Sequence, residues 1–362
     1  MRIAHVTQPT TAGVAVVVRD LARAGVESGD EVTVLSPEEG ELPGWCAELG
    51  IPWRAVELRR LPGPWDVRAL LALRRALTGF DVVHLHSSKA GALGRLVLRG
   101  GRATVVFTPH GWSWYAGAGV TSRVYRTVER LAARWCDAIV CVSQAEAADG
   151  RGVLGQRAPI VVVPNGVDTD RFSPAAEPVR EPGLVVCVGR LCHQKGQDRL
   201  LRVLARSRTP GLRVRLVGAG PDRASLLELA HDLGVQDRVE LVGQGDPVGH
   251  LRAADLVVGP SRWEGMSLAM LEAMSVGSAV VTTTVAGAEA LRGVGVLVEQ
   301  GPEPQVLEDL TAAVDGLLPD GARLARLRSE SRARAVADYS WPSVVARHRD
   351  VWAAPRARQG QP

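Results

Sequence analysis

Short apolar runs, most of them rich in valine, alternate along the chain with longer segments whose apolar positions recur every three or four residues. The runs are typical of strands buried on both faces, and the longer segments of helices with one apolar face. In the first half, helices are predicted at 14–28, 67–77 and 121–134, between strands at RIAHVT, EVTVLS, DVVHLH, TVVFTP and AIVCVS. This alternation favours a parallel sheet covered by helices on each side.

The pattern starts again after a proline-rich segment, 166–182, which is interpreted as a linker. Helices are expected at 223–233, 267–276 and 305–318, between strands at LVVCVGRL, RVRLVGAG, RVELVG, LVVGPS, AVVTTT and GVLVEQ. We therefore predict two doubly wound, Rossmann-like α/β domains, 1–165 and 183–340. A last helix, about 341–356, is expected to pack back on the first domain. Ligands of such sheets bind beyond the carboxyl ends of the strands, so two facing domains would hold them in a cleft.

Composition narrows the class of protein. The net charge is +4, and the arginines are spread along the chain, so nucleic-acid binding has no specific support. The five cysteines include no C-x-x-C and are expected to be reduced and buried. No secretory signal or membrane-length apolar run is recognised, which predicts a cytoplasmic protein.

Only two lysines occur, Lys89 and Lys195, among 43 lysines and arginines. Lys195 and Arg190 lie in VGRLCHQKGQDRLL, on the predicted loop between the first strand of the second domain and the next helix. A compact ammonium and a planar guanidinium at that edge suit a diphosphate. Two solvated loop charges are the alternative that these residues leave open.

The stretch PSRWEGMSLAMLEAM carries two carboxylates, Glu264 and Glu272, around a helix predicted to begin near Gly265. Free backbone N–H groups at a helix start, here those of 265–267, bind anions. Carboxylates on either side of such a turn can hold the hydroxyls of a sugar and of a ribose. In the alternative reading, Glu264 caps the helix and Glu272 is a solvated charge. The small, apolar neighbours of Glu272 argue against that reading.

Together with VVVPNGVDTDRF, HLHSSKAGALGR and FTPHGW, these motifs resemble the family 4 retaining glycosyltransferases of the GT-B fold over essentially the whole chain. The resemblance implies that Arg190 and Lys195 bind the donor diphosphate, with Glu264 on the donor sugar and Glu272 on the ribose. It implies further donor contacts at Gly265, Met266, Ser267, Gly13, Gly243, Gln244 and His110, and acceptor contacts at His86, Ser88 and Lys89.

The resemblance also implies retaining, metal-independent transfer, and a UDP-sugar is the expected donor. No cofactor is expected. The D-x-D at Asp168–Asp170 falls in the predicted linker, the eight histidines show no zinc-binding spacing, and GAGPDR is only a fragment of a dinucleotide fingerprint. Departures from the family pattern are the single glycine in TTAGVAV and Thr284, which stands where an aspartate is common. They leave a contact by Glu289 open.

The acceptor is expected to be lipid-linked or a polysaccharide in cell-surface glycan assembly, and a small natural product is the alternative. A GT-B epimerase and a non-catalytic sugar-nucleotide binder are further alternatives, which the intact set Arg190, Lys195, Glu264 and Glu272 disfavours. An arginine-rich face of the first domain is expected to reach an anionic membrane or to be a solvated surface. It comprises Arg95, Arg99, Arg102, Arg123, Arg126, Arg130 and Arg134.

Overall fold

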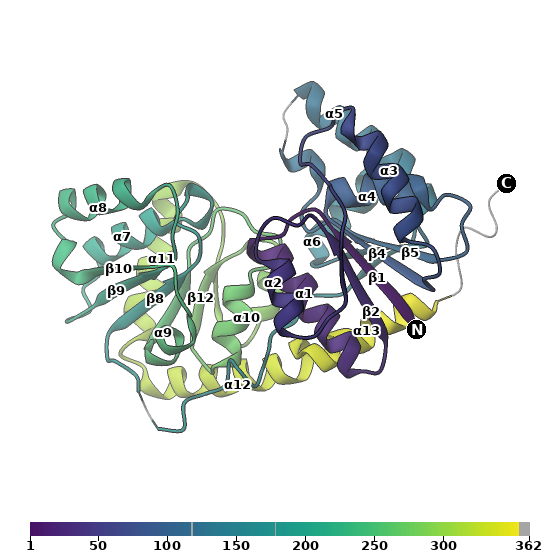
Figure 1. The fold of residues 1–362 in the computed structure, drawn as a ribbon. Helices are drawn as coiled ribbons and strands as arrows, with labels where there is room; N and C mark the ends of the chain where they lie inside the picture. Colours follow the sequence, from purple (N-terminus) through teal and green to yellow (C-terminus); the bar gives the residue numbers. More distant parts are fainter. Residues whose placement is uncertain (117–118, 178, 355–362) are drawn as a thin grey trace. The chain divides into compact units, whose positions relative to one another are not determined.

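The computed structural model describes residues 1–116, 119–177 and 179–354, which form two compact units (Figure 1). Unit 1 comprises residues 1–166 together with the C-terminal segment from Trp341, and unit 2 comprises Val167–Ser340. Each unit is built on one parallel sheet.

The sheet of unit 1 has seven strands in the order β3-β2-β1-β4-β5-β6-β7. All five predicted strands of this half are present, and the parallel pairing is confirmed. β3 was not predicted: it has three residues and lies at the edge of the sheet. The bounds are β1 Arg2–Thr7, β2 Glu31–Ser36, β3 Trp53–Ala55, β4 Val82–His86, β5 Thr104–Thr108, β6 Ala138–Cys141 and β7 Ile160–Val162.

Helices cover both faces of this sheet. Ala4 and Val6 of β1 enter a core shared with α3, α4 and α6, whereas Ile3 and His5 alternate to the opposite face, where α13 packs. Burial on both sides explains why the strands are nearly continuous in apolar residues. The bounds are α1 Ala12–Glu27, α2 Leu42–Glu48, α3 Trp65–Ala76, α4 Ser88–Val97, α5 Gly119–Ala132, α6 Gln144–Leu154 and α13 Trp341–Ala353.

The sheet of unit 2 has six parallel strands in the order β10-β9-β8-β11-β12-β13, all of them predicted. Val185 and Cys187 of β8 enter one core, and Leu184 and Val186 the opposite one. The strands are β8 Leu184–Val188, β9 Arg213–Val217, β10 Val239–Gly243, β11 Leu256–Gly259, β12 Val280–Thr283 and β13 Val296–Val298. The helices are α7 Gln197–Arg206, α8 Arg223–Asp232, α9 Val248–Ala253, α10 Leu268–Ser275, α11 Glu303–Leu317 and α12 Gly321–Tyr339.

Most of the predicted linker is packed against unit 2. Phe172 is buried in the core of that unit, and the N–H of Val167 donates to the carbonyl of Tyr339 at 2.8 Å. The chain passes between the units at Gly166–Val167 and again at Ser340–Trp341. Among the described residues, no helix combines the length and apolarity that crossing a membrane requires.

Candidate functional site

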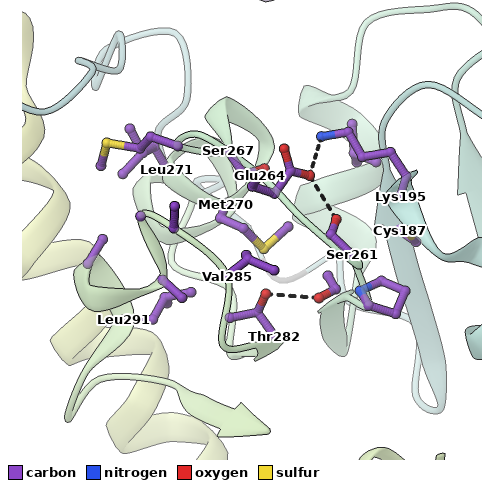
Figure 2. A pocket seen from close by; sticks show the side chains of 18 residues that line it. Cys187, Lys195, Ser261, Glu264, Ser267, Met270, Leu271, Thr282, Val285 and Leu291 are labelled. Carbon is purple, nitrogen blue, oxygen red and sulfur yellow. Dashed lines mark hydrogen bonds and ion pairs between the residues drawn. The ribbon is translucent and has the colours of Figure 1, made fainter. Parts of the chain in front are cut away.

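A pocket lies at the carboxyl edge of the sheet in unit 2 and encloses about 490 Å³ of empty space, part of it open to solvent. Val188 ends β8 and Gly259 ends β11, and both line the pocket beside Thr282 of β12. Neighbouring parallel strands end at the same edge, so residues distant in sequence meet there. The loop after β11, the first turns of α10 and the segment 285–291 complete the wall (Figure 2).

Lys195 and Glu264 form an ion pair on this wall. The Nζ of Lys195 lies 2.6 Å from Oε1 of Glu264, which also accepts a hydrogen bond of 2.7 Å from the hydroxyl of Ser261 (Figure 2). The side chains are 20% and 8% exposed, so salt screens this pair less than an exposed one. An ammonium has three N–H donors, and the pair leaves donors for phosphate oxygens. The pocket thus offers a cation and a carboxylate side by side.

Gly196 explains how the loop of Lys195 reaches the loop of Glu264. Its φ is +68°, and a Cβ built there would lie 2.2 Å from the carbonyl oxygen of Pro260. Glycine adopts this conformation without strain and has no Cβ to clash. The two loops can therefore touch, with Lys195 in a one-turn 3₁₀ helix, His193–Lys195, immediately before Gly196.

The loop after β11 is held by a network that the sequence did not reveal. Arg199 of α7 is buried, pairs with Glu303 at 2.7 Å, and donates to the carbonyl of Pro260 at 3.2 Å. Thr283 and Gln300 both donate to the carbonyl of Ser261. The sequence signal for Arg199 was an arginine on an otherwise buried part of α7. These bonds fix the backbone from which Glu264 projects.

The helix after Glu264 agrees with the expected range 267–276 but begins after Gly265, where the anion-binding helix start was placed. It starts at Leu268, with Ser267 as its N-cap, because residues 265–267 form a turn ahead of it. Met266 and Ser267 line the pocket, whereas Gly265 and Glu272 are not among the lining residues. Glu272 is half-buried and lies about one turn into α10 instead of two. The predicted backbone donors of 265–267 are therefore turn amides.

The other candidates of unit 2 have more open positions. Arg190 is exposed on the loop after β8, outside the pocket lining, and its carbonyl accepts from Gln197 at 3.0 Å. Gly243 ends β10 with a φ of +89°, and Gln244 beside it is exposed. Glu289 stands between the pocket-lining residues Ala288 and Ala290. No described contact tests their predicted roles.

Cys187 lies in the pocket wall but is no nucleophile. Burial raises the pKa of its thiol to about 12, so the thiol is protonated at neutral pH. A covalent intermediate on this cysteine is therefore disfavoured.

In unit 1, backbone strain marks the carboxyl edge of the sheet. Among the described residues, Ala12, Ser87 and His110 are the non-glycine residues with positive φ, at 59°, 70° and 51°. They follow β1, β4 and β5, and β1 and β4 are neighbours at the point where the strand order reverses. Strained residues concentrate at functional sites, and switch points of doubly wound sheets bind ligands. Gly13, exposed in the first turn of α1, lies at this edge.

Two of the three expected acceptor residues are engaged by the protein itself. His86 is 1% exposed, and its ring nitrogens hydrogen-bond His5 and His110, each at 3.0 Å. His86 also lines a pocket of unit 1 with Thr108 and His110, and its acceptor contact stays a prediction. The Nζ of Lys89 lies 2.6 Å from Oδ2 of Asp66, so its charge is already paired. Ser88, the first residue of α4, is half-exposed.

The structure shows where the D-x-D carboxylate and the histidines lie. Asp168 of the D-x-D accepts the backbone N–H groups of Asp170 and Arg171, so its carboxylate caps a turn. The histidines, which show no metal-binding spacing in sequence, do gather in space: ring nitrogens of His5, His84 and His86 lie within 4.8 Å of one another.

Two doubly wound α/β units, each built on one parallel sheet, have the architecture of the GT-B fold. Residues 11–171 match the model of glycosyltransferase family 4, and residues 182–320 match that of the group 1 glycosyl transferases. The chain belongs to glycosyltransferase family 4, whose members use nucleotide sugars.

Curated relatives and solved structures are similar over much of the chain. A GDP-mannose-dependent alpha-(1-6)-phosphatidylinositol monomannoside mannosyltransferase of Mycolicibacterium smegmatis is 33% identical over 74% of this chain and 75% of its own. A D-inositol 3-phosphate glycosyltransferase of Xylanimonas cellulosilytica is 30% identical, covering 96% and 93%. The structure of Anabaena HepE in complex with UDP aligns with a TM-score of 0.83 at 20% identity, covering 97% and 99%.

Proposed function

We propose that the chain transfers a hexose from a nucleoside diphosphate sugar to a hydroxyl group of a lipid-linked acceptor, with retention and without a metal ion. The observation that carries this proposal is the Lys195–Glu264 pair in the pocket wall of unit 2. A cation suits the departing diphosphate, and the adjacent carboxylate suits the hydroxyls of the sugar attached to it.

The proposed chemistry uses fixed charges in place of a metal. Lys195 and Arg190 stabilise the charge that develops on the diphosphate as its bond to the sugar breaks. A phosphate oxygen takes the proton of the acceptor hydroxyl, which attacks from the same face, so the anomeric configuration is retained. Glu264 positions the sugar. A second carboxylate facing it, as in a retaining glycosidase, is not required.

The identity of the donor nucleotide, UDP or GDP, is proposed from the sequence and from the relatives. UDP is the expectation from sequence, and a relative from Escherichia coli, 30% identical over 62% of this chain, is named for UDP-Gal. The Mycolicibacterium relative is named for GDP-mannose. The test incubates the purified chain with UDP-glucose, UDP-galactose and GDP-mannose and measures the nucleoside diphosphate released. Turnover of one nucleotide class supports the proposal, and no turnover of any donor with any acceptor class would contradict it.

Helix α5 supports peripheral contact with a membrane that carries the acceptor. Its exposed side includes Val120, Val124 and Leu131, and Val120 is 73% exposed. At about 100° per residue these lie within roughly 40° of one another, and Arg123 lies about 60° to one side of them. Arg134 is exposed on the 3₁₀ turn Ala133–Trp135 that follows α5. An apolar sector beside a basic one is the pattern of helices that lie on anionic membranes.

One arginine of the predicted basic face, Arg95, is not on the surface. Arg95 is 0% exposed, pairs with buried Glu129 at 2.6 Å, and lies over the ring of Phe107. It is a core residue, because the carboxylate and the aromatic face together compensate its charge. The surface proposed to meet a membrane is therefore that of α5 and the residues that follow it.

A soluble acceptor is the second candidate, because one relative is named a D-inositol 3-phosphate glycosyltransferase. Transfer assays with phosphatidylinositol and polyprenyl-diphosphate acceptors, compared with inositol phosphate and small natural products, separate the two. Transfer only to soluble acceptors would replace the lipid-linked proposal.

A further inference from the structure

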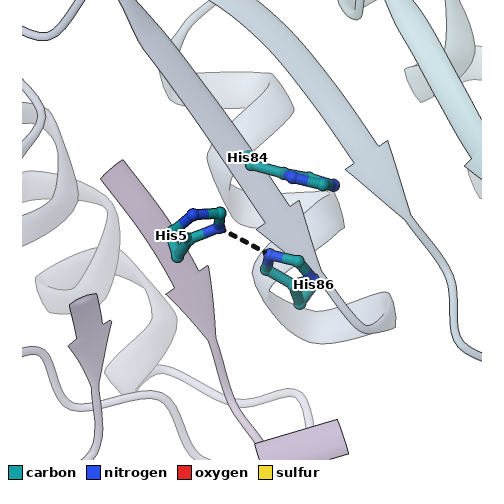
Figure 3. Close-up of side chains that lie close together, drawn as sticks. All are labelled: His5, His84 and His86. Atoms are coloured by element: carbon teal, nitrogen blue, oxygen red, sulfur yellow. Dashed lines mark hydrogen bonds between the residues drawn. The ribbon is translucent and has the colours of Figure 1, made fainter. Parts of the chain in front are cut away.

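Buried histidines of unit 1 gather on one face of its sheet. His5 of β1 pairs in register with His84 of β4, and His86 lies two residues further along, on the same face (Figure 3). His348 of α13 covers this face, and its ring centroid lies 5.3 Å from that of His84. His5, His84, His86 and His348 are all buried. A buried cluster of this kind needs an account of where its ring nitrogens bond.

Three of the rings form a continuous chain. The Nδ1 of His5 lies 3.0 Å from the Nε2 of His86, and the Nδ1 of His86 lies 3.0 Å from the Nε2 of His110. His84 stands outside this chain, because its Nε2 bonds the hydroxyl of Thr108 at 2.7 Å. The chain leads from the buried face to the strained residue His110 at the carboxyl edge of the sheet.

The three rings are neutral at physiological pH. Burial lowers the pKa of His5 to about 3 and that of His110 to about 4, and it holds the pKa of His86 well below its ordinary value. A neutral imidazole has one N–H donor and one bare acceptor nitrogen. The chain therefore has two proton arrangements, in which all the hydrogen bonds run either toward His110 or away from it.

His5, at the far end of the hydrogen-bonded series of rings, decides between the two proton arrangements. The Nε2 of His5 is buried and has no hydrogen-bond partner among the described residues. If the bonds ran away from His110, this nitrogen would carry an unpaired N–H, and unpaired buried N–H groups are rare. The bonds therefore run toward His110, whose Nε2 accepts and whose proton sits on Nδ1; His110 is only half-buried, so an N–H there is not sealed from solvent as one on His5 would be. No hydrogen bond reaches that Nδ1 from the described residues.

We propose that His5 and His86 are positioning residues, which fix His110 as the Nδ1–H tautomer and so present a hydrogen-bond donor to the oxygen atoms of the sugar donor. The proposal rests on the proposed function for the contact with His110. It gives His86 a role that does not depend on contact with an acceptor. The positive φ of His110 fixes the backbone while the chain fixes the proton.

A metal ion is a poorer account of the same rings. A zinc ion would need one ring nitrogen from each of His5, His84 and His86, which lie within 4.8 Å of one another, but the Nε2 of His84 already bonds the hydroxyl of Thr108 at 2.7 Å. The close pair, His5 and His86, already shares a proton at 3.0 Å. Metal binding would have to break that bond.

The test reads the tautomer directly, in resting protein labelled with ¹⁵N-histidine. Long-range ¹H–¹⁵N correlation distinguishes protonated from bare ring nitrogens, and assignment uses His110→Gln. We expect His110 to be protonated at Nδ1 in the unmodified chain. In His5→Leu, His110 should become a mixture of both tautomers. In His5→Asn, whose amide N–H can replace the Nδ1–H of His5, His110 should return to a single tautomer. His348→Leu, in the same core but outside the chain, is the matched control.

Kinetics supply the functional readout. If only a fraction of His5→Leu holds the competent tautomer, the apparent donor affinity falls by that fraction. We expect donor KM to rise severalfold, with kcat nearly kept, and His5→Asn to recover. Protonation of His110 at Nε2, an unaltered tautomer in His5→Leu, or one equivalent of tightly bound metal per chain would each overturn the proposal. The tautomer is measured without substrate, so failure of the proposed transfer reaction is a separate result.

Discussion

At the scale of single residues, Lys195 is the most informative side chain. Its ammonium lies between the turn that precedes Gly196 and the carboxylate of Glu264, a position for a compact point charge. Lys195→Ala should lower transfer by about 10²-fold or more, the effect of losing one fixed donor to a developing charge. Lys195→Arg should also be impaired, because the planar guanidinium does not match the geometry of an ammonium.

Steady-state transfer kinetics check this prediction. Arg202→Ala, which removes an exposed cation from α7, is the matched control and should be near normal. The melting temperature shows whether Lys195→Ala remains folded. Full activity of Lys195→Arg would show that a compact cation is not what this position requires.

Glu264 and Glu272 should fail in different ways. Glu264→Gln replaces a charge-assisted acceptor near the reacting sugar, so its loss should fall mainly on kcat. Glu272→Gln should raise donor KM, because a ribose contact is shared by ground and transition states. Donor titrations at saturating acceptor separate the two parameters. The reverse pattern would exchange the assignments of sugar and ribose.

At the scale of elements, the strands were predictable because burial on both faces leaves near-continuous apolar runs. β3 escaped because a three-residue edge strand leaves too short a pattern. The range 267–276 was close to α10, but a helix start near Gly265 was too early because the turn at 265–267 is set by tertiary contacts. Gly287 lies against Met266, where a Cβ on Gly287 would come within 2.8 Å of the Cα of Met266. The bond between Lys195 and Glu264 joins residues 69 positions apart, and no local pattern encodes it.

Helix α5 carries the element-scale prediction. Each arginine near an anionic surface contributes about 1 kcal/mol, so Arg123→Ala with Arg134→Ala should weaken binding to phosphatidylglycerol vesicles by roughly 30-fold. Vesicle co-sedimentation at low ionic strength measures this. The charge-matched control, Arg202→Ala with Arg206→Ala on α7, should bind normally. Equal binding of all three proteins, or binding that ignores salt, would exclude α5 as the contact.

At the scale of the whole molecule, the two units differ in the burial of their histidines. Burial lowers the pKa of His5 and His348 to about 3 and of His110 to about 4, and holds those of His84 and His86 well below the ordinary value. The stability from keeping these rings neutral is complete above pH about 6.5. This stability is lost as the pH falls toward 4, because the histidines bind protons in the unfolded state but stay neutral in the folded unit. The histidines of unit 2, His193, His231 and His250, are not buried.

Unit 1 should therefore unfold first on acidification. Each histidine that stays neutral in the folded unit lowers the free energy of unfolding by about 1.4 kcal/mol for every pH unit below its unfolded pKa. Every tryptophan except Trp263 lies in unit 1, so tryptophan fluorescence follows that unit while circular dichroism follows both. His348→Leu should move the fluorescence midpoint to lower pH, and His231→Leu should not. Coincident transitions at an unshifted midpoint would contradict the assignment of acid sensitivity to these rings.

The central claim is that fixed protein charges, and not a metal ion, support transfer with retention. The most direct measurement is NMR of the product sugar, formed by the purified chain from its active nucleotide sugar with and without a chelator. The account predicts the donor's anomeric configuration in the product and an unchanged rate in the chelator. An inverted product, or activity lost in chelator and restored by manganese, would contradict it.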